Sequence, residues 1–140
     1  PVTDPQTVHQ SKFSMGTVLG LIAAHNTADL VSFDGALKDD AVTEFRDRVS
    51  MTLDTEIDQA YPQQWIGKVT VTTCDGNVVT AVVQEPKGDP GNTLSRPEIE
   101  DKLKRLGTYK AAASVDVLDS LATRIWALEQ QPTINEIIPT

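Results

Sequence analysis

A hairpin signal in the middle of the chain constrains the fold more than any other feature. A run in which valine and threonine alternate, Lys68–Cys74, precedes Asp75-Gly76, and a second strand-like run, Asn77–Val83, follows. Asp-Gly is typical of a two-residue type I′ turn, because both central residues of that turn need a positive φ. That register places one set of residues on one face, Val69, Val71, Val78 and Val82, and another on the opposite face, Val79, Ala81 and Val83. We therefore expect an antiparallel hairpin whose second strand is covered on both sides.

Capping residues predict two helices before the hairpin. Ser14 is a good N-cap for a helix through Ala24. Asp39 or Asp40 can cap a second helix that runs to about Val49. Both helices have apolar residues at helical spacing, which indicates that each buries one face.

The first of these helices has two distinct faces. Its apolar residues at helical spacing, which we expect to be buried, are Val18, Leu19, Ile22 and Ala23. Small residues stand four apart at Gly16, Gly20 and Ala24, and residues four apart lie on one side of a helix. Glycine lets a neighbouring backbone approach closely, so this side of the helix allows tight packing.

Two further helices are predicted after the hairpin. Ser95 and Glu98 form a capping box before a helix that ends near Leu106, and Ser114 begins a last helix with a long apolar stripe. Ahead of the hairpin, Val49–Asp54 alternates strictly between apolar and polar residues, which is typical of a short strand. We therefore predict an α+β fold, in which three or four helices pack against a small, mostly antiparallel sheet with a central hairpin.

Charge and composition exclude several classes of partner. The 140 residues include 12 Lys+Arg and 20 Asp+Glu, a net charge of −8. This balance argues against binding of nucleic acid, which requires clustered basic residues, and against anionic membrane surfaces. The longest apolar run, Thr17–Ala24, is far shorter than the ~18 residues of a membrane span. The single cysteine, Cys74, excludes an intrachain disulfide and fits a reducing compartment, so we expect a soluble, cytoplasmic domain.

The residues alone contain no complete catalytic set. The only histidines, His9 and His25, stand in no metal-ligand spacing, and no serine-nucleophile motif is present, so we expect no metal site. His25 is a candidate substrate contact, although a histidine at a helix end more often caps the last carbonyls. The glycine-rich loop Lys87–Asn92 lacks the Gly-Lys-Ser/Thr of a phosphate-binding loop, and we interpret it as a pair of turns.

Three segments, in order, resemble a known family. They are Ser11–Val18, which leads into the first helix, Val69–Gly76, which ends in Asp-Gly, and Pro86–Leu103. The third is the most specific and is similar to the pattern kGdp-x-nPLs-x-eeie-x-Kf. Together they resemble the C-terminal part of the MmgE/PrpD family, which includes 2-methylcitrate dehydratase, cis-aconitate decarboxylase and iminodisuccinate epimerase.

The resemblance implies that residues 1–140 are one α+β domain, the C-terminal domain of a longer chain with a large helical domain upstream. It also implies a small polycarboxylate substrate and proton abstraction next to a carboxylate, with neither a metal nor an organic cofactor. That chemistry needs a general base and donors that stabilise developing enolate charge. In the family most of these groups lie upstream of the residues present here, so we assign no catalytic residue in this chain. We also expect a homodimer.

One family position can be compared directly. The family's Phe-Ser-x-Pro-Tyr stretch places a tyrosine near the active site in some members, and here Thr17 takes the place of the tyrosine and Gly16 that of the proline. A threonine hydroxyl also donates a hydrogen bond but has a shorter reach. We expect Lys12, Ser14 and Thr17, together with His25, to contact the substrate. The simpler interpretations are that Ser14 is a helix cap and that Lys12 is a solvated side chain.

Two functions follow from these observations. The first is a part of a cofactor-independent lyase or isomerase, by default a 2-methylcitrate dehydratase-like hydro-lyase of propionate metabolism, with the 140 residues alone not catalytically competent. The alternative is a non-catalytic domain that packs, dimerises or closes the site of a partner.

Overall fold

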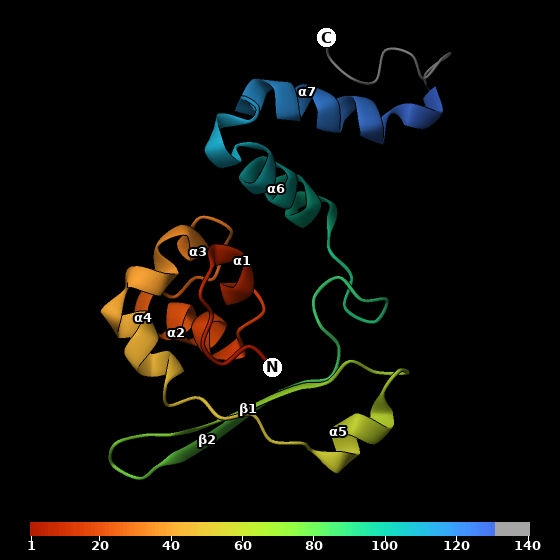
Figure 1. Ribbon diagram of the computed structural model, residues 1–140. Coiled ribbons are helices and arrows are strands. Elements are labelled where there is room, and N and C mark those ends of the chain that lie inside the picture. The colour runs from red at the N-terminus through yellow and green to blue at the C-terminus, as the bar shows by residue number, and fades with distance from the viewer. Residues whose placement is uncertain (131–140) are drawn as a thin grey trace. The chain divides into compact units, whose positions relative to one another are not determined.

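The computed structural model describes residues 1–130 and has an α+β fold (Figure 1). Its helices and strands, in chain order, are α1 (Val8–Ser11), α2 (Met15–His25), α3 (Ser32–Gly35), α4 (Asp40–Arg46), α5 (Thr55–Ala60), β1 (Gly67–Thr72), β2 (Val78–Val83), α6 (Arg96–Gly107) and α7 (Val115–Trp126). Short 3-10 turns lie at Ala36–Lys38, Tyr109–Ala111 and Leu128–Gln130. The predicted α+β class is confirmed.

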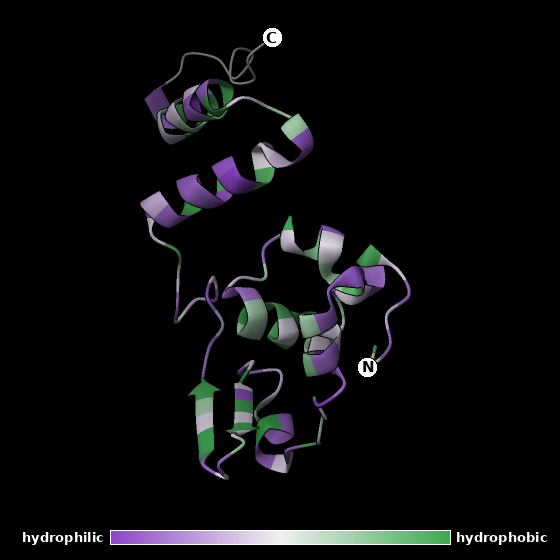
Figure 2. Ribbon diagram, turned by 90° about the vertical axis from the view of Figure 1, so that its left-hand side faces the viewer, coloured by the Kyte–Doolittle hydropathy of each residue, from purple (hydrophilic) through white to green (hydrophobic). Residues whose placement is uncertain are grey.

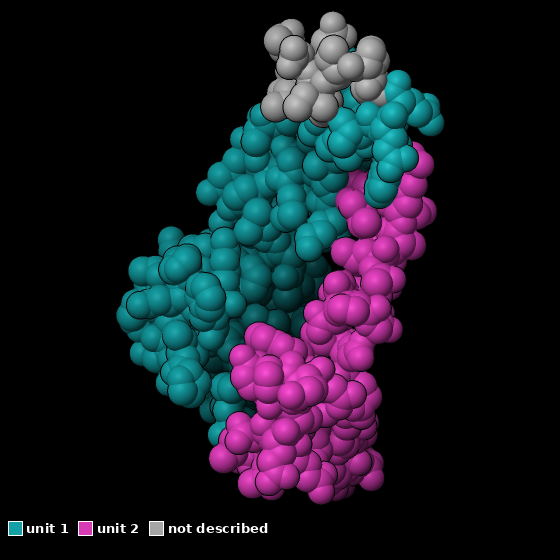
Figure 3. Space-filling view, turned by 90° about the vertical axis from the view of Figure 1, so that its right-hand side faces the viewer, with its two compact units in different colours: residues 1–51, 102–140 teal, residues 52–101 magenta. Residues whose placement is uncertain are grey.

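The chain divides into two compact units (Figure 3). Unit 1 contains Pro1–Met51 and the chain from Lys102 onward, and unit 2 contains Thr52–Asp101. Unit 1 holds all the buried residues of the described chain, whereas no residue of unit 2 is buried. Unit 2 therefore lacks the apolar core on which a small fold normally depends.

The core of unit 1 is built where α2 packs on α4. Leu21, Phe33, Ala36 and Val42 form its buried apolar cluster. A Cβ added to Gly20 would lie 2.7 Å from the Val42 carbonyl oxygen, so the two helix backbones touch at this point. The tight packing that the glycine side allows is confirmed.

The predicted apolar stripe of α2 is only partly buried, with Val18 packed against the core. The residues of α2 that are buried are Thr17, Gly20 and Leu21, while Ile22 is 46% exposed. The reason is that the glycine side of the helix faces α4, and this turns the expected stripe, one residue further round the helix, partly toward solvent.

Side-chain caps begin the helices where the sequence predicts them. Ser14 Oγ accepts the Thr17 N–H, and Asp39 Oδ1 accepts the Val42 N–H at 3.2 Å. Ser114 caps α7 through the Val117 N–H. Each cap satisfies a backbone donor that has no partner within its helix.

The hairpin forms as predicted, but its register differs by one residue. Val71 pairs with Val79. The Thr73 N–H donates to the Asn77 carbonyl at 2.9 Å, and the Gly76 N–H donates to the Thr73 carbonyl. Within the turn, Gly76 alone has a positive φ, 85°. The connection is therefore a three-residue loop closed by a left-handed glycine, not a two-residue type I′ turn.

The change of register moves side chains between the two faces. Val79 and Ala81 share a face with Val69, whereas Val78 and Val82 lie on the other, so the predicted grouping was wrong. The predicted cover of β2 is also contradicted, because every residue of both strands is exposed. In Figure 2, β2 is green and pale along its length, in keeping with its valine-rich sequence.

The predicted strand at Val49–Asp54 is absent from the structure. Asp54 instead caps α5 by accepting the N–H groups of Glu56 and Ile57, and its carboxylate pairs with the Lys68 ammonium at 2.8 Å. The capping role ends the extended segment at Asp54, and no neighbouring strand accompanies it.

The apolar side chains of α7 are only partly buried. Leu118 and Ala122 are buried, whereas Val115, Val117 and Ile125 are exposed.

Within residues 1–130, no helix combines the length and the apolarity that crossing a bilayer requires.

Substitution of Gly20 by alanine tests the α2–α4 contact. We expect Gly20→Ala to lower the free energy of unfolding by about 1–3 kcal/mol, because the new methyl group would force the helices apart. Urea unfolding followed by circular dichroism measures this change. The matched control is Gly35→Ala, where an added Cβ meets nothing within 4 Å, and there we expect a change within about 0.5 kcal/mol. Equal midpoints for the two variants would contradict the close approach.

Candidate functional site

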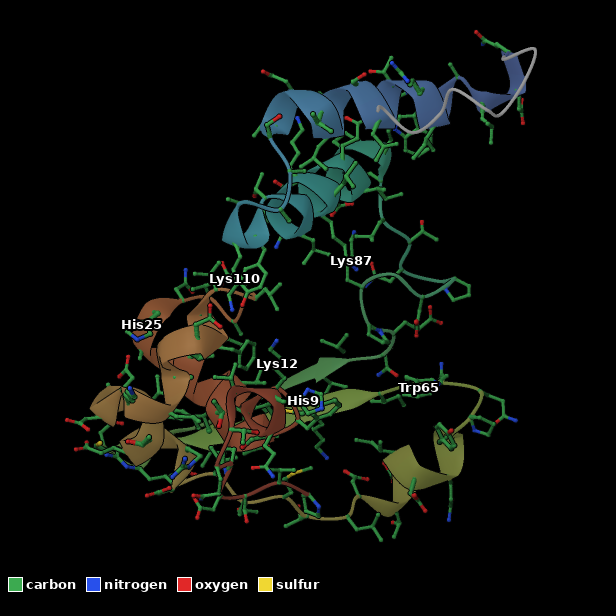
Figure 4. The ribbon with its side chains drawn as sticks, turned by 45° about the horizontal axis from the view of Figure 1, so that its top comes forward. His9, Lys12, His25, Trp65, Lys87 and Lys110 are labelled. Carbon is green, nitrogen blue, oxygen red and sulfur yellow. The ribbon has the colours of Figure 1, made fainter. Side chains whose placement is uncertain are left out.

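The candidate residues at the start of α2 lie at the corner between α1 and α2 (Figure 4). Lys12 is the C-cap residue of α1, and its side chain is exposed. Within the described chain its ammonium makes neither an ion pair nor a side-chain hydrogen bond. The neighbouring His9 ring instead packs edge-on against Phe13, with 5.2 Å between the ring centroids. Lys12 is thus a cation at this corner that is available to a ligand.

Ser14 and Thr17 lie beneath this corner and are both buried. Ser14 Oγ is 3.3 Å from the Thr17 nitrogen, which makes Ser14 the N-cap of α2. Thr17 Oγ1 has no hydrogen-bond partner among the described residues. Burying a hydroxyl without a hydrogen-bond partner costs about 1–3 kcal/mol of stability. The Thr17 hydroxyl can therefore still donate and accept a hydrogen bond if a partner reaches it.

His25 ends α2, and its imidazole contacts the Asp39 carboxylate. Its Nε2 lies 2.6 Å from Asp39 Oδ2, and the two side chains are 46% and 30% exposed. The same carboxylate accepts the Val42 N–H as the cap of α4. The hydrogen bonds from His25 and Val42 lower the pKa of Asp39 below its usual value. Asp39 therefore holds the imidazole in one orientation and leaves Nδ1 for another partner.

The structure brings three of the four predicted residues together and separates the fourth. Lys12, Ser14 and Thr17 belong to the first turn of α2 and the residues just before it. His25 lies at the other end of a helix of 11 residues, about 16 Å away along the axis. The sequence identified Asp39 only as a helix cap, because nothing in its spacing from His25 indicates a contact.

A second polar cluster joins distant parts of unit 1. The Tyr109 hydroxyl donates to both carboxylate oxygens of Asp34, at 3.0 and 3.1 Å. Lys110 lies over the Tyr109 ring, 5.0 Å from its centroid, and its pKa is raised by its interaction with the Tyr109 side chain and by the nearby Asp34 charge. Asp34 and Tyr109 are 75 positions apart in the sequence, so no spacing along the chain predicts their contact.

The loop of the third motif, in unit 2, is a pair of turns as predicted. The Asp89 N–H donates to the Pro86 carbonyl, the Gly88 N–H donates to the Asn92 carbonyl, and Gly88 has a φ of 110°. Lys87 Nζ lies 3.0 Å from Glu98 Oε1, which ties the loop to the start of α6. The Ser95 hydroxyl and backbone N–H both donate to the same carboxylate, and with Lys87 they lower the pKa of Glu98 to about 2. The bond from the Ser95 N–H to the Glu98 carboxylate is the glutamate half of a capping box, and the ion pair with Lys87 reinforces it.

Within residues 1–130, no group of three or more His, Cys, Asp or Glu side chains is arranged to hold a metal ion.

Comparison with family models gives one decisive result, since the MmgE/PrpD C-terminal domain matches residues 1–127. The chain belongs to this family. All three segments of the MmgE/PrpD resemblance lie inside the matched range, and they form the α1–α2 corner, the hairpin turn and the loop before α6. Comparisons with curated proteins and with solved structures yield no match.

Titration of Glu98 tests the capping box of this MmgE/PrpD domain. We expect its side-chain carboxyl carbon, followed by NMR, to titrate near pH 2, and Ser95→Ala to raise that midpoint toward 4.5. Lys87→Ala should raise the midpoint less, because the Ser95 hydrogen bonds are the larger cause.

The same shift predicts how stability depends on pH. Since the pKa of Glu98 is lower in the folded chain, its stabilising contribution is complete above pH 4.5 and is lost as the pH falls from 4.5 to about 2. Glu98→Gln should therefore show a smaller loss of stability over that interval. An unchanged pH dependence in Glu98→Gln would show that the folded and unfolded chains titrate alike at this residue.

Proposed function

We propose that this MmgE/PrpD domain is part of a cofactor-independent lyase or isomerase that acts on small di- or tricarboxylic acids, with dehydration of a 2-methylcitrate-like substrate as the default reaction. The observation that carries the proposal is the family match over residues 1–127. We further propose that the domain works in the cytoplasm, with a helical domain upstream, and as a homodimer.

The chemistry of such a reaction assigns a limited role to this domain. Removal of a proton next to a carboxylate builds negative charge that cations and hydrogen-bond donors stabilise. With a net charge of −8, this domain has few cations that could bind an anionic substrate. The exposed Lys12 is such a cation, because it has no ion-pair partner in the described chain. We therefore assign Lys12 to a substrate carboxylate and the general base to another part of the full protein.

The groups around Lys12 support this assignment. The N-terminus of α2 carries partial positive charge, which favours an anion close to it. Ser14 contributes as the cap that holds the helix start in place, and the Thr17 hydroxyl is the polar group that remains unpaired. A shift that uncovers Thr17 would let it donate a hydrogen bond to the same carboxylate.

His25 is a separate candidate contact. The main carbon chain of 2-methylcitrate has five atoms and is no longer than two residues of extended peptide, at about 3.6 Å each, so it is much shorter than the roughly 16 Å between the ends of α2. One substrate molecule therefore cannot touch both Lys12 and His25. We propose that His25, held by Asp39, binds a carboxylate through its free Nδ1 only at its own end of the helix.

The full-length protein that carries this domain provides the test. Dehydration of 2-methylcitrate is followed by the ultraviolet absorbance of the alkene product. We expect Lys12→Ala to raise KM at least tenfold, because a lost charge-assisted hydrogen bond costs about 1.5–3 kcal/mol.

The matched control is Lys38→Ala, which removes another exposed lysine for which the described chain shows no ion pair. We expect its KM to stay within twofold of the wild-type value. A folded protein that turns over none of a panel of tricarboxylates would disprove the enzymatic proposal and favour the non-catalytic alternative.

A further inference from the structure

We propose that β2 of one copy pairs antiparallel with β2 of a second copy, centred on Thr80, to form a four-stranded sheet. The inference rests on the homodimer proposed above and names its contact surface, but it is independent of the reaction. It starts from unit 2, a hairpin-containing unit in which no residue is buried. A two-stranded hairpin with apolar residues on both faces is marginal in water and gains stability from additional strands.

The outer edge of β2 offers the hydrogen-bonding groups for such a pairing. In the described chain the sheet contains β1 and β2 alone, so β2 has one free edge. The bond from the Thr73 N–H to the Asn77 carbonyl sets the phase of the ladder, and hydrogen-bonded pairs recur at every second residue. The backbone groups of Val79 and Ala81 therefore point to β1. Those of the alternate residues Val78, Thr80 and Val82 point outward.

Charge distinguishes this edge from the rest of an acidic chain. From Val78 to Val83 the strand contains no charged residue and no proline, which are the devices that normally protect an edge strand. The edge of β1, by contrast, carries Lys68 in an ion pair with Asp54. In a chain with a net charge of −8, β2 is a surface where two copies can meet without opposing charges of like sign.

The acidic residues on either side of β2 have their carboxylates directed to other residues of unit 2, and Glu85 Oε2 is buried there without a hydrogen-bond partner in the described chain. The Asp75 carboxylate accepts hydrogen bonds from the Thr73 hydroxyl and the Asn77 amide. The Glu85 carboxylate lies against Gly91. Neither carboxylate therefore extends freely over the strand.

One register uses all the outward groups at once. With Thr80 opposite the second copy's Thr80, Val78 faces the second copy's Val82, and every outward N–H and carbonyl of the strand is paired. On the other face Val79 meets the second copy's Ala81. Val78 is 64% and Val79 60% exposed in the single chain, so the pairing covers apolar surface on both faces.

The threonine hydroxyl groups of the two copies also match when β2 pairs with itself around Thr80. Thr70 and Thr80 already form a cross-strand hydroxyl pair, with 3.0 Å between their oxygens. In the proposed sheet two such pairs come side by side, and cross-strand threonine pairs stabilise a sheet. A strand that matches itself in backbone, apolar side chains and hydroxyls favours a second copy over an unrelated partner.

Proline substitutions test the free edge. We expect the purified chain to have a mass of twice 15.2 kDa by light scattering, and Thr80→Pro to return it to 15.2 kDa. Proline at position 80 removes an outward N–H but none of the bonds to β1. Thr70→Pro is the matched control, because it makes the same change at the paired position on the β1 edge, and there we expect the dimer to persist.

A designed disulfide tests the register. In a Cys74→Ser background, Thr80→Cys should give a covalent dimer on mild oxidation, because residues that form a hydrogen-bonded antiparallel pair lie about 5.5 Å apart at Cα. Val79→Cys in the same background should not, because the two copies of residue 79 would be more than about 7 Å apart.

The two measurements separate the possible failures. A monomeric wild-type chain at 100 μM, with no disulfide formed by Thr80→Cys, would overturn both the homodimer and the surface. A dimer that survives Thr80→Pro and fails to form the disulfide would overturn the surface while leaving the homodimer in place. Neither outcome bears on the proposed reaction, which is measured by turnover.

Discussion

The contact between α2 and α4 organises the core of the segment Pro1–Met51 of unit 1. Gly20 lets the α2 backbone meet the carbonyl oxygen of Val42, and the Val42 side chain is completely buried beside it. Because the helices approach so closely, the cap of α4 lies within reach of the last residue of α2. The His25–Asp39 contact is therefore a consequence of helix packing. The start of α2, by contrast, lies beside the exposed Lys12 because only Phe13 separates Lys12 from the Ser14 cap.

The two units differ in what stabilises them. Unit 1 has a small apolar core, whereas unit 2 depends on polar links such as Lys68 with Asp54 and Lys87 with Glu98. Exposed ion pairs contribute about 0–1 kcal/mol each, too little to replace a core. Unit 2 thus has a well-formed hairpin and a well-formed capped helix start with no apolar interior between them. Because unit 2 has no apolar interior, its exposed hairpin gains stability when another strand pairs with it.

The functional assignment divides the chemistry between this domain and the rest of the protein. Enolate-forming reactions require a base and several donors, and the corner at Lys12 supplies one exposed cation, a capped helix start and one unused hydroxyl. These groups suit binding and orientation of a carboxylate. The family match covers residues 1–127 with the C-terminal domain of the MmgE/PrpD family, and the base is proposed to lie in another part of the full protein.

Much of the local structure was predictable from sequence because it depends on neighbouring residues. Ser14, Asp39 and Ser114 cap helices through backbone groups three residues away. Three short segments together, of which Pro86–Leu103 is the most specific, indicated the family. The hairpin was predictable for the same reason. Its register was not, since Asp-Gly is compatible with both a two-residue and a three-residue loop, and only the backbone hydrogen bonds of Thr73 distinguish them.

The sequence by itself determined the capped starts of α2, α4 and α7, the existence of the hairpin, the acidic character of the chain and its family. The tertiary structure decided which residues are buried and which meet. Thr17 and Leu21 are buried in place of the expected Ile22, because the glycine side of α2 faces α4. The pairs His25–Asp39 and Tyr109–Asp34 join residues 14 and 75 positions apart. Contacts of this kind depend on how helices pack in three dimensions, and no spacing along the chain encodes them.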